Sequence, residues 1–386
     1  MLYHRCSDSD GAKGQAEQTT GQSSTGHAKA GSCFHTPEGG SYTQLRPQRP
    51  ASDQGLIPST SPGWLVARAQ GCLLGQLAGD ALGSLVEFLG PEQIRRRYPS
   101  GVRDLADGGT WNTLAGQPTD DSEMALALAR TLLRVGTYDP AEARRAYVAW
   151  LRSGPFDYGT TVRAGLLGAP NPASQANGAL MRVSPLGIFG ANHDPWQVAE
   201  WARQDAALTH PHLVCLQMNA LFAMAIAHAV RTGCSPAELH AQVERWAGEM
   251  NVVESVRDAL AGAAVAPPAD YTRQQGWVLI AFRNAFWQLR HAAGLEEGVV
   301  DTVMRGGDTD TNACIAGALL GAVHGRGAVP DRWARAILSC RPEEGRPGVH
   351  RPRPPAYWPV DALDLAARLV VRHPDKPAPE GSPRPA

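Results

Sequence analysis

Apolar side chains recur every three to four residues along most of the chain between residues 61 and 372. This spacing is typical of helices that bury one face, and the alternating Val, Ile and Thr pattern of strands is scarce. Clusters of Gly, Pro and Asn separate the periodic segments and favour turns between them. The pattern predicts an all-α protein whose helices cover residues 64–82, 121–136, 140–152, 196–208, 212–232, 236–249, 276–293, 311–324 and 361–372.

The two ends of the chain lack this pattern. Residues 1–60 are rich in Gly, Ser, Thr, Gln and Pro, and residues 373–386 are rich in Pro. Segments that can bury little apolar surface do not offset the entropy lost on ordering. We therefore expect a single compact multi-helix domain over residues 61–372, between a disordered N-terminal tail and a disordered C-terminal tail.

The composition narrows the class of protein. The chain has 386 residues, of which 43% are hydrophobic and 19% charged, and its formal net charge is -1. This balance is that of a soluble globular protein, and it provides no excess of positive charge for nucleic acid or anionic lipid. Nucleic-acid binding and membrane association are therefore not indicated.

The cysteines and the N-terminus indicate in which cellular compartment the protein is expected. The seven cysteines are scattered and form no C-x-x-C pair, so neither a disulfide framework nor a zinc site is expected. The N-terminus has no apolar segment typical of a signal peptide, and apolar runs such as "CIAGALLGAV" are shorter than a membrane span. We expect a cytoplasmic protein.

Lysine is confined to Lys13, Lys29 and Lys376. A Walker phosphate loop ends in Gly-Lys, and Schiff-base chemistry needs a lysine amine, so residues 30–375 can support neither. Any recognition of an anion by a charged side chain in this region falls to arginine.

Two segments carry glycine at four-residue spacing. Glycine costs roughly 1 kcal/mol against alanine inside a helix, so a row of glycines on one ridge needs a packing reason. We expect each ridge to let another helix backbone come close. The two ridges are Gly71, Gly75, Gly79 and Gly83, and Gly317, Gly321 and Gly325.

Two acidic clusters precede apolar helical segments, in "PTDDSEMALAL" and in "GGDTDTNACIAGALLGA". Capping and the helix dipole explain one aspartate at each start, but Asp120 with Asp121 and Asp308 with Asp310 are more than capping needs. Unpaired carboxylates repel each other and resist burial, so a cation is expected between them. The candidate ligands are all oxygen atoms, which favours Mg²⁺ or Mn²⁺, and two facing clusters could hold a pair of ions.

A calcium-binding EF-hand loop starting at Asp308 is a rival interpretation. It requires Gly at the sixth position and Glu at the twelfth, where this chain has Ala313 and Leu319. The EF-hand is therefore rejected.

Five motifs together resemble one family. "GDALGSLVEF", "PTDDSEMALAL", "NGALMRVSPLGI", "LTHPH" and "GGDTDTNACIAGALLGA" occur in the order and at the spacing of the ADP-ribosylglycohydrolases, over about residues 64–372. The resemblance implies an all-α catalytic domain with two Mg²⁺ or Mn²⁺ ions at helix N-termini. It implies hydrolysis, by metal-activated water, of the glycosidic bond between ADP-ribose and an acceptor on a protein side chain or a small molecule.

The same resemblance implies roles for individual residues. Glu87 falls where some members have an acidic residue on a loop beside the metals, and His210 matches a Thr-His near the ADP-ribose. Ser122 replaces a second Thr found in many members, and the roles of Ser174 and Gln175 stay open. The implied metal ligands are Thr119, Asp120, Asp121, Asp308, Asp310 and Thr311, and the implied ADP-ribose loop contains Asn177, Gly178, Ala179 and Met181.

The residue types fit this chemistry. Departure of the acceptor from the ribose builds oxocarbenium character, and bound metals can orient ribose hydroxyls and lower the pKa of a water. Either Glu87 or Asp308 could shuttle a proton. The Gly and Asn of "ASQANGALMR" could bring free backbone N–H groups to a diphosphate. A zinc-ligand role for His210 is not favoured.

Two classes of function remain: a metal-dependent hydrolase, and a non-catalytic relative that binds ADP-ribose or serves structurally. The non-catalytic class would be marked by lost ligands, whereas all six ligand positions and Glu87 are present. The enzyme is therefore favoured. Its acceptor stays open among arginine, serine, a nucleic-acid base and O-acetyl-ADP-ribose.

Overall fold

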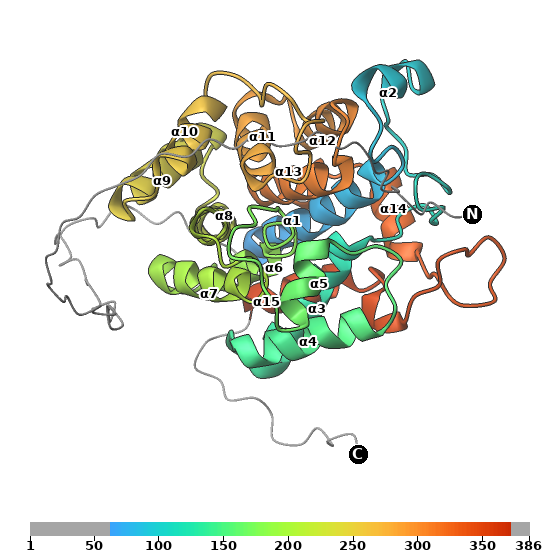
Figure 1. Cartoon of the computed structure of the whole chain (residues 1–386), viewed down its shortest axis with the longest axis horizontal. Helices are drawn as coiled ribbons and strands as arrows, with labels where there is room; N and C mark the ends of the chain where they lie inside the picture. The colour runs from blue at the N-terminus through green and yellow to red at the C-terminus, as the bar shows by residue number, and fades with distance from the viewer. Residues whose placement is uncertain (1–61, 372–386) are drawn as a thin grey trace, which may run out of the picture. The chain divides into compact units, whose positions relative to one another are not determined.

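The structure, a computed structural model, describes residues 62–371 (Figure 1). This part of the chain is helical, and its only β pairings are two isolated bridges. The all-α prediction is therefore confirmed for it, while the predicted tails lie outside the described residues. The helices are α1 (Pro62–Gly83), α2 (Pro91–Arg97), α3 (Asp120–Val135), α4 (Pro140–Arg152), α5 (Thr160–Leu166), α6 (Ser184–Gly190), α7 (Pro195–Ala207), α8 (Leu213–Thr232), α9 (Pro236–Glu249), α10 (Glu254–Ala263), α11 (Val278–His291), α12 (Leu295–Met304), α13 (Thr309–His324), α14 (Asp331–Ser339) and α15 (Ala362–Val371), with short 3-10 turns η1 (Arg326–Ala328) and η2 (Pro355–Tyr357).

All nine helices expected from the apolar spacing are present, with ends that differ from the expected ones by at most two residues. The helices that the sequence analysis missed are α2, α5, α6, α10, α12 and α14, which have seven to ten residues each. Few turns give few apolar repeats, so their periodicity is weak. The starts of α3 and α13 matter most here, because they place both acidic clusters at helix N-termini.

The α1 and α13 helices pack antiparallel along their glycine ridges. A Cβ added at Gly75 would overlap the backbone of Gly317, and one at Gly71 would overlap the backbone of Gly321 and Gly325. At the other end of the contact, Gly83 lies against the backbone of Asp310. The expected close approach is confirmed, and it brings the C-terminal end of α1 to the N-terminus of α13.

We expect Gly79→Ala to destabilise the protein by about 2 kcal/mol or more, because its new Cβ would overlap the carbonyl oxygen of Ala313. Backbone atoms cannot move aside as a flexible side chain can. Thermal unfolding of Gly79→Ala and Gly248→Ala measures the effect. Gly248 of α9 has nothing near its missing Cβ, so its alanine should be neutral or slightly stabilising. Equal melting temperatures for the two variants would contradict this packing.

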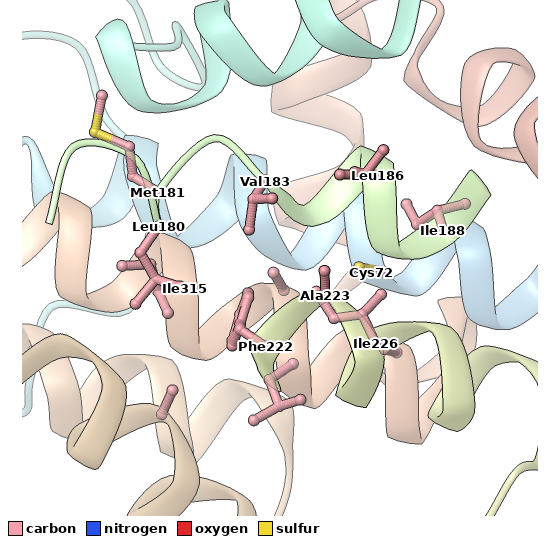
Figure 2. Packing of buried hydrophobic residues seen from close by; sticks show 14 of the residues in the cluster. Cys72, Leu180, Met181, Val183, Leu186, Ile188, Phe222, Ala223, Ile226 and Ile315 are labelled. Atoms are coloured by element: carbon pink, nitrogen blue, oxygen red, sulfur yellow. The ribbon is translucent and has the colours of Figure 1, made fainter. Parts of the chain in front are cut away.

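The remaining helices surround the α1–α13 pair. The α11 and α12 helices pack on α13, α15 packs on α1, and α6 and α7 pack on α8. Figure 2 shows side chains of α6, α8 and α13 gathered in this core, among them Leu186, Phe222 and Ile315. A Cβ at Gly187 would lie 2.7 Å from the Cβ of Ile226, so a glycine again permits close packing. The loop that precedes α6 is held on α1 by Gln76, whose Nε2 donates to the Met181 carbonyl at 3.1 Å.

One described helix, α8, is long and apolar enough by length and composition to cross a membrane. The expectation that no apolar run reaches that length was therefore wrong. Within its apolar window, however, 83% is buried inside the protein, which is also the behaviour of a core helix. The described cysteines are free thiols, and the cytoplasmic location stays a prediction.

Candidate metal centre and active site

The acidic clusters meet where α1 ends and where α3 and α13 begin. One carboxylate oxygen each from Asp80, Asp121 and Asp310 lies within 4.8 Å of the others. The same holds for Glu87, Asp308 and Asp310. The two predicted clusters therefore form one group of buried carboxylates, with Asp310 shared between its halves.

Asp80 is a member of this group that the list of predicted ligands omits. Its carboxylate accepts hydrogen bonds from Thr119 Oγ1 at 2.8 Å and from the backbone N–H groups of Thr119 and Ser122 at 3.2 Å. Thr119 occupies the N-cap position of α3 but makes no side-chain cap bond. Asp80 therefore replaces the missing cap from α1 and holds the first turn of α3 in place.

The first turn of α3 is also held by a buried ion pair. Arg353 donates to both oxygens of Glu123, at 2.8 and 2.7 Å, and both side chains are 2% exposed. Trp150 Nε1 donates to Glu123 at 2.8 Å. Removing one partner of such a pair leaves a buried charge uncompensated. The pair therefore helps to fix the start of α3.

Burial raises the pKa values of the clustered carboxyls. For Asp120, Asp121 and Asp310, repulsion from neighbouring carboxylates adds to burial, and their pKa values lie well above the ordinary range. The Oδ1 atom of Asp121 is buried and has no hydrogen-bond partner among the described residues. A cation would satisfy this oxygen and remove the repulsion. Because every donor is an oxygen, the residues fit Mg²⁺ or Mn²⁺.

Most of the clustered carboxylates line a cavity of about 280 Å³. Most predicted site residues line it, whereas Thr119 and Ala179 are buried beside it and do not. Thr119 Oγ1 lies 3.2 Å from Asp121 Oδ2, so it can still support that ligand. The predicted residues on the cavity wall are Glu87, Asp120, Asp121, Asn177, Gly178, Met181, His210, Asp308, Asp310 and Thr311.

A second cavity of about 460 Å³ lies between α2, α12 and residues 268–272. Its charged lining is mixed, with Arg95 and Arg305 beside Asp270 and Asp301, and Arg305 is already paired with Asp301 at 3.0 Å. It contains none of the clustered carboxylates. The smaller cavity is therefore the candidate active site.

Glu87 is held at the cavity by the loop that follows α2. Trp111 Nε1 donates to Glu87 Oε2 at 2.5 Å, and Thr110 Oγ1 donates to the Glu87 carbonyl at 3.1 Å. The next residue, Phe88, has a φ of 66°, which a non-glycine residue rarely adopts. Burial, with repulsion from Asp157 and Asp308, raises the pKa of Glu87 to about 8.

Asp157 is a cavity residue that sequence reasoning missed. It lies in the loop between α4 and α5 and lines the cavity together with Asp120. Burial raises its pKa to about 6, and a hydrogen bond from Asp120 opposes that rise. The stretch "GPFDYG" carries no periodic or repeated signal, so only the folded chain shows Asp157 beside the first acidic cluster.

The loop before α6 connects the predicted substrate residues to the second acidic cluster. Asn177 Nδ2 donates to Asp308 Oδ2 at 2.7 Å. Ser174 and Gln175, whose roles the sequence left open, make hydrogen bonds to neighbouring segments: Ser174 Oγ bonds Thr161 Oγ1 at 2.9 Å, and Gln175 Oε1 accepts from Trp277 Nε1 at 3.0 Å. These two side chains attach the loop to Thr161 of α5 and to Trp277 before α11.

A model of the ADP-ribosylglycohydrolase family matches residues 62–366. The chain therefore belongs to the ADP-ribosylglycohydrolase family. It is also similar to a solved structure titled an ADP-ribosylglycohydrolase-related protein complex, with a TM-score of 0.67 and 29% identity over 80% of this chain and 99% of the other.

Curated relatives agree with this family. The ADP-ribosyl-[dinitrogen reductase] glycohydrolase of Rhodospirillum rubrum is 29% identical, covering 69% of this chain and 88% of the relative. The ADP-ribosylarginine hydrolase Tri1 of Pseudomonas putida is 27% identical, with 74% and 81% covered. The ADP-ribosylhydrolase ARH3 of Homo sapiens is 27% identical, with 70% and 89% covered. Relatives of this chain are thus hydrolases of ADP-ribosyl linkages.

We expect Mn²⁺ or Mg²⁺ to raise the melting temperature more at about pH 8 than at about pH 5. Raised folded-state pKa values mean that the carboxyls bind more protons when folded than when unfolded. Their contribution to stability is complete below roughly pH 4 and is lost as the pH rises through about 6 for Asp80 and about 8 for Glu87. A cation replaces the lost protons. Melting curves with EDTA and with Mn²⁺ at both pH values test this, and equal shifts would contradict it.

Proposed function

We propose that this protein is a divalent-metal-dependent hydrolase that cleaves the glycosidic bond between ADP-ribose and an acceptor. The observation that carries the proposal is a cavity lined by six carboxylates, four of them at the N-termini of α3 and α13, in a member of the ADP-ribosylglycohydrolase family. Asp120, Asp121, Asp308, Asp310 and the Thr311 hydroxyl would hold two Mg²⁺ or Mn²⁺ ions. Bound ions would supply Lewis acidity to a water and orient the ribose hydroxyls.

Other side chains of the cavity would handle the proton and the substrate. Glu87 is fixed through one oxygen by Trp111, which leaves its second oxygen for the attacking water. Asp308 accepts from Asn177 and is also hydrogen-bonded by Thr311, and Asp157 lies beside Asp120, so both carboxylates are placed less freely. We therefore assign the proton transfer to Glu87, with Asp157 and Asp308 as the alternatives.

The charge of the cavity favours a cationic acceptor. Six carboxylates carry more negative charge than two divalent ions neutralise, and no Lys or Arg is among the described residues that line the cavity. Phe88 and Tyr158, which are 53% and 43% exposed, add aromatic faces on which a guanidinium can stack. Among acceptors, we therefore propose the arginine side chain, as in the name of the Tri1 relative.

The experiment compares peptides ADP-ribosylated on arginine or on serine, O-acetyl-ADP-ribose, and an ADP-ribosylated nucleic-acid base. Free ADP-ribose is measured with Mn²⁺ present. We expect release from the arginine peptide to be fastest. Faster release from any other substrate would contradict the acceptor assignment, and no release from any of them would support the non-catalytic alternative.

A further inference from the structure

His210 lines the cavity with a buried nitrogen that has no protein partner. The side chain is fully buried, and its Nε2 atom makes no hydrogen bond to the described residues. The backbone of Gly178 lies close to this edge of the ring, since a Cβ there would lie 3.4 Å from Nε2 and 3.2 Å from Cε1. A buried polar atom facing a cavity costs stability unless a ligand satisfies it. The ligand atom required depends on whether Nε2 carries a proton.

A buried chain of hydrogen bonds decides where that proton is. The Arg182 guanidinium, which can only donate, donates to Thr209 Oγ1 at 3.0 Å. Thr209 Oγ1 lies 2.7 Å from His210 Nδ1. If Nδ1 were protonated, the hydroxyl would accept from both neighbours, and its own proton would have no acceptor among the described residues. The hydroxyl therefore donates to Nδ1, and a neutral ring carries its proton on Nε2.

Arg182 is itself fixed. It pairs with Asp205 at 3.0 Å, and neither side chain is exposed. Tyr147 donates to the same aspartate at 2.8 Å, and Arg182 also donates to the Gly178 carbonyl at 3.1 Å. Burial and the nearby guanidinium both lower the pKa of His210, which keeps the ring neutral. Arg182 thus holds both the loop that contains Gly178 and the Thr209 hydroxyl in place.

We propose that Arg182 and Thr209 are positioning residues that make His210 a permanent hydrogen-bond donor, so that it selects an oxygen acceptor of the ADP-ribosyl substrate. A ring free to exchange tautomers could equally accept a hydrogen bond and would discriminate less. The identity of the ligand rests on the proposed function, whereas the relay itself does not. Neither residue lines the cavity: Thr209 acts through His210, and Arg182 acts through Thr209 and through the Gly178 carbonyl.

Thr209→Val tests the relay, with Thr209→Ser as the matched control. Valine keeps the shape but removes the hydroxyl, and serine keeps the hydroxyl. We expect ¹⁵N spectra of histidine-labelled wild-type protein, with His210 assigned through His210→Gln, to show the proton on Nε2 and a hydrogen-bonded Nδ1. Thr209→Val should lose the hydrogen-bond shift of Nδ1 and bind ADP-ribose about tenfold more weakly by calorimetry. Thr209→Ser should keep both properties within about threefold.

A wild-type spectrum with the proton on Nδ1 would overturn the relay, even if Thr209→Val fails to fold. So would equal ADP-ribose affinity in the valine and serine variants. A wild-type protein that shows the expected tautomer but no affinity for ADP-ribose would support the relay and contradict the proposed function. The two hypotheses therefore fail separately.

Discussion

Asp121→Asn should reduce hydrolysis by about 10³-fold or more while leaving the helical fold intact. Asp121 lies within 4.8 Å of Asp80 and Asp310, and its Oδ1 atom has no hydrogen-bond partner among the described residues. An amide there is a poorer cation ligand, so the affinity for Mg²⁺ or Mn²⁺ should fall with the activity. Asp310→Asn should behave alike. Activity is measured by release of ADP-ribose and metal affinity by calorimetry.

The same substitution should raise the melting temperature of the metal-free protein. Burial and neighbouring carboxylates raise the pKa of Asp121, so removing its charge relieves an unfavourable interaction in the folded state. Asp258→Asn makes the same chemical change on the exposed surface of α10 and should alter neither activity nor metal affinity. Full activity of Asp121→Asn in excess EDTA would show that the clustered carboxylates do not bind a catalytic metal.

Glu87→Gln should lower turnover by roughly 10² or more and keep the affinity for ADP-ribose within a few-fold. Glutamine can still accept the hydrogen bond from Trp111, so the position of the side chain should be preserved. Only the ability to take a proton is lost. Single-turnover kinetics measures the chemical step, and calorimetry measures binding.

Asp157→Asn provides the comparison, because Asp157 lines the same cavity and also has a raised pKa. A smaller loss in Asp157→Asn than in Glu87→Gln would agree with the assignment of Glu87. Unchanged turnover in Glu87→Gln, or a loss confined to binding, would remove Glu87 and leave Asp157 and Asp308.

The parts of the fold that could be predicted from the sequence are those with local causes. Long apolar repeats predicted α1, α3, α8 and α13, and the glycine ridges predicted a close helix contact. The partner of each ridge was not predictable, because helical spacing shows a packing face and not the helix that covers it. A short helix such as α12, "LEEGVVDTVM", contains Gly and β-branched residues, and tertiary packing overrides its weak propensity.

The residues of the candidate site were likewise predictable only where a local sequence pattern marks them. Paired aspartates before apolar segments indicated a cation site without a structure, and the motif resemblance supplied the rest of the ligand set. Asp80 and Asp157 were absent from that set. Asp80 sits among apolar residues of a helix, and its role arises only because Thr119 and Ser122 meet it across 39 or more positions of sequence. Trp111 and Arg182 likewise act through contacts that no local pattern encodes.

The most direct test of the account measures release of free ADP-ribose from an arginine-ADP-ribosylated peptide by the purified protein. The protein is first treated with EDTA, then dialysed, and finally supplied with Mn²⁺ or Mg²⁺. We expect no release above the uncatalysed rate without metal, and full recovery of release with at least one of the two ions. Release at an equal rate in EDTA, or none after metal is restored with all the ADP-ribosylated substrates, would contradict it.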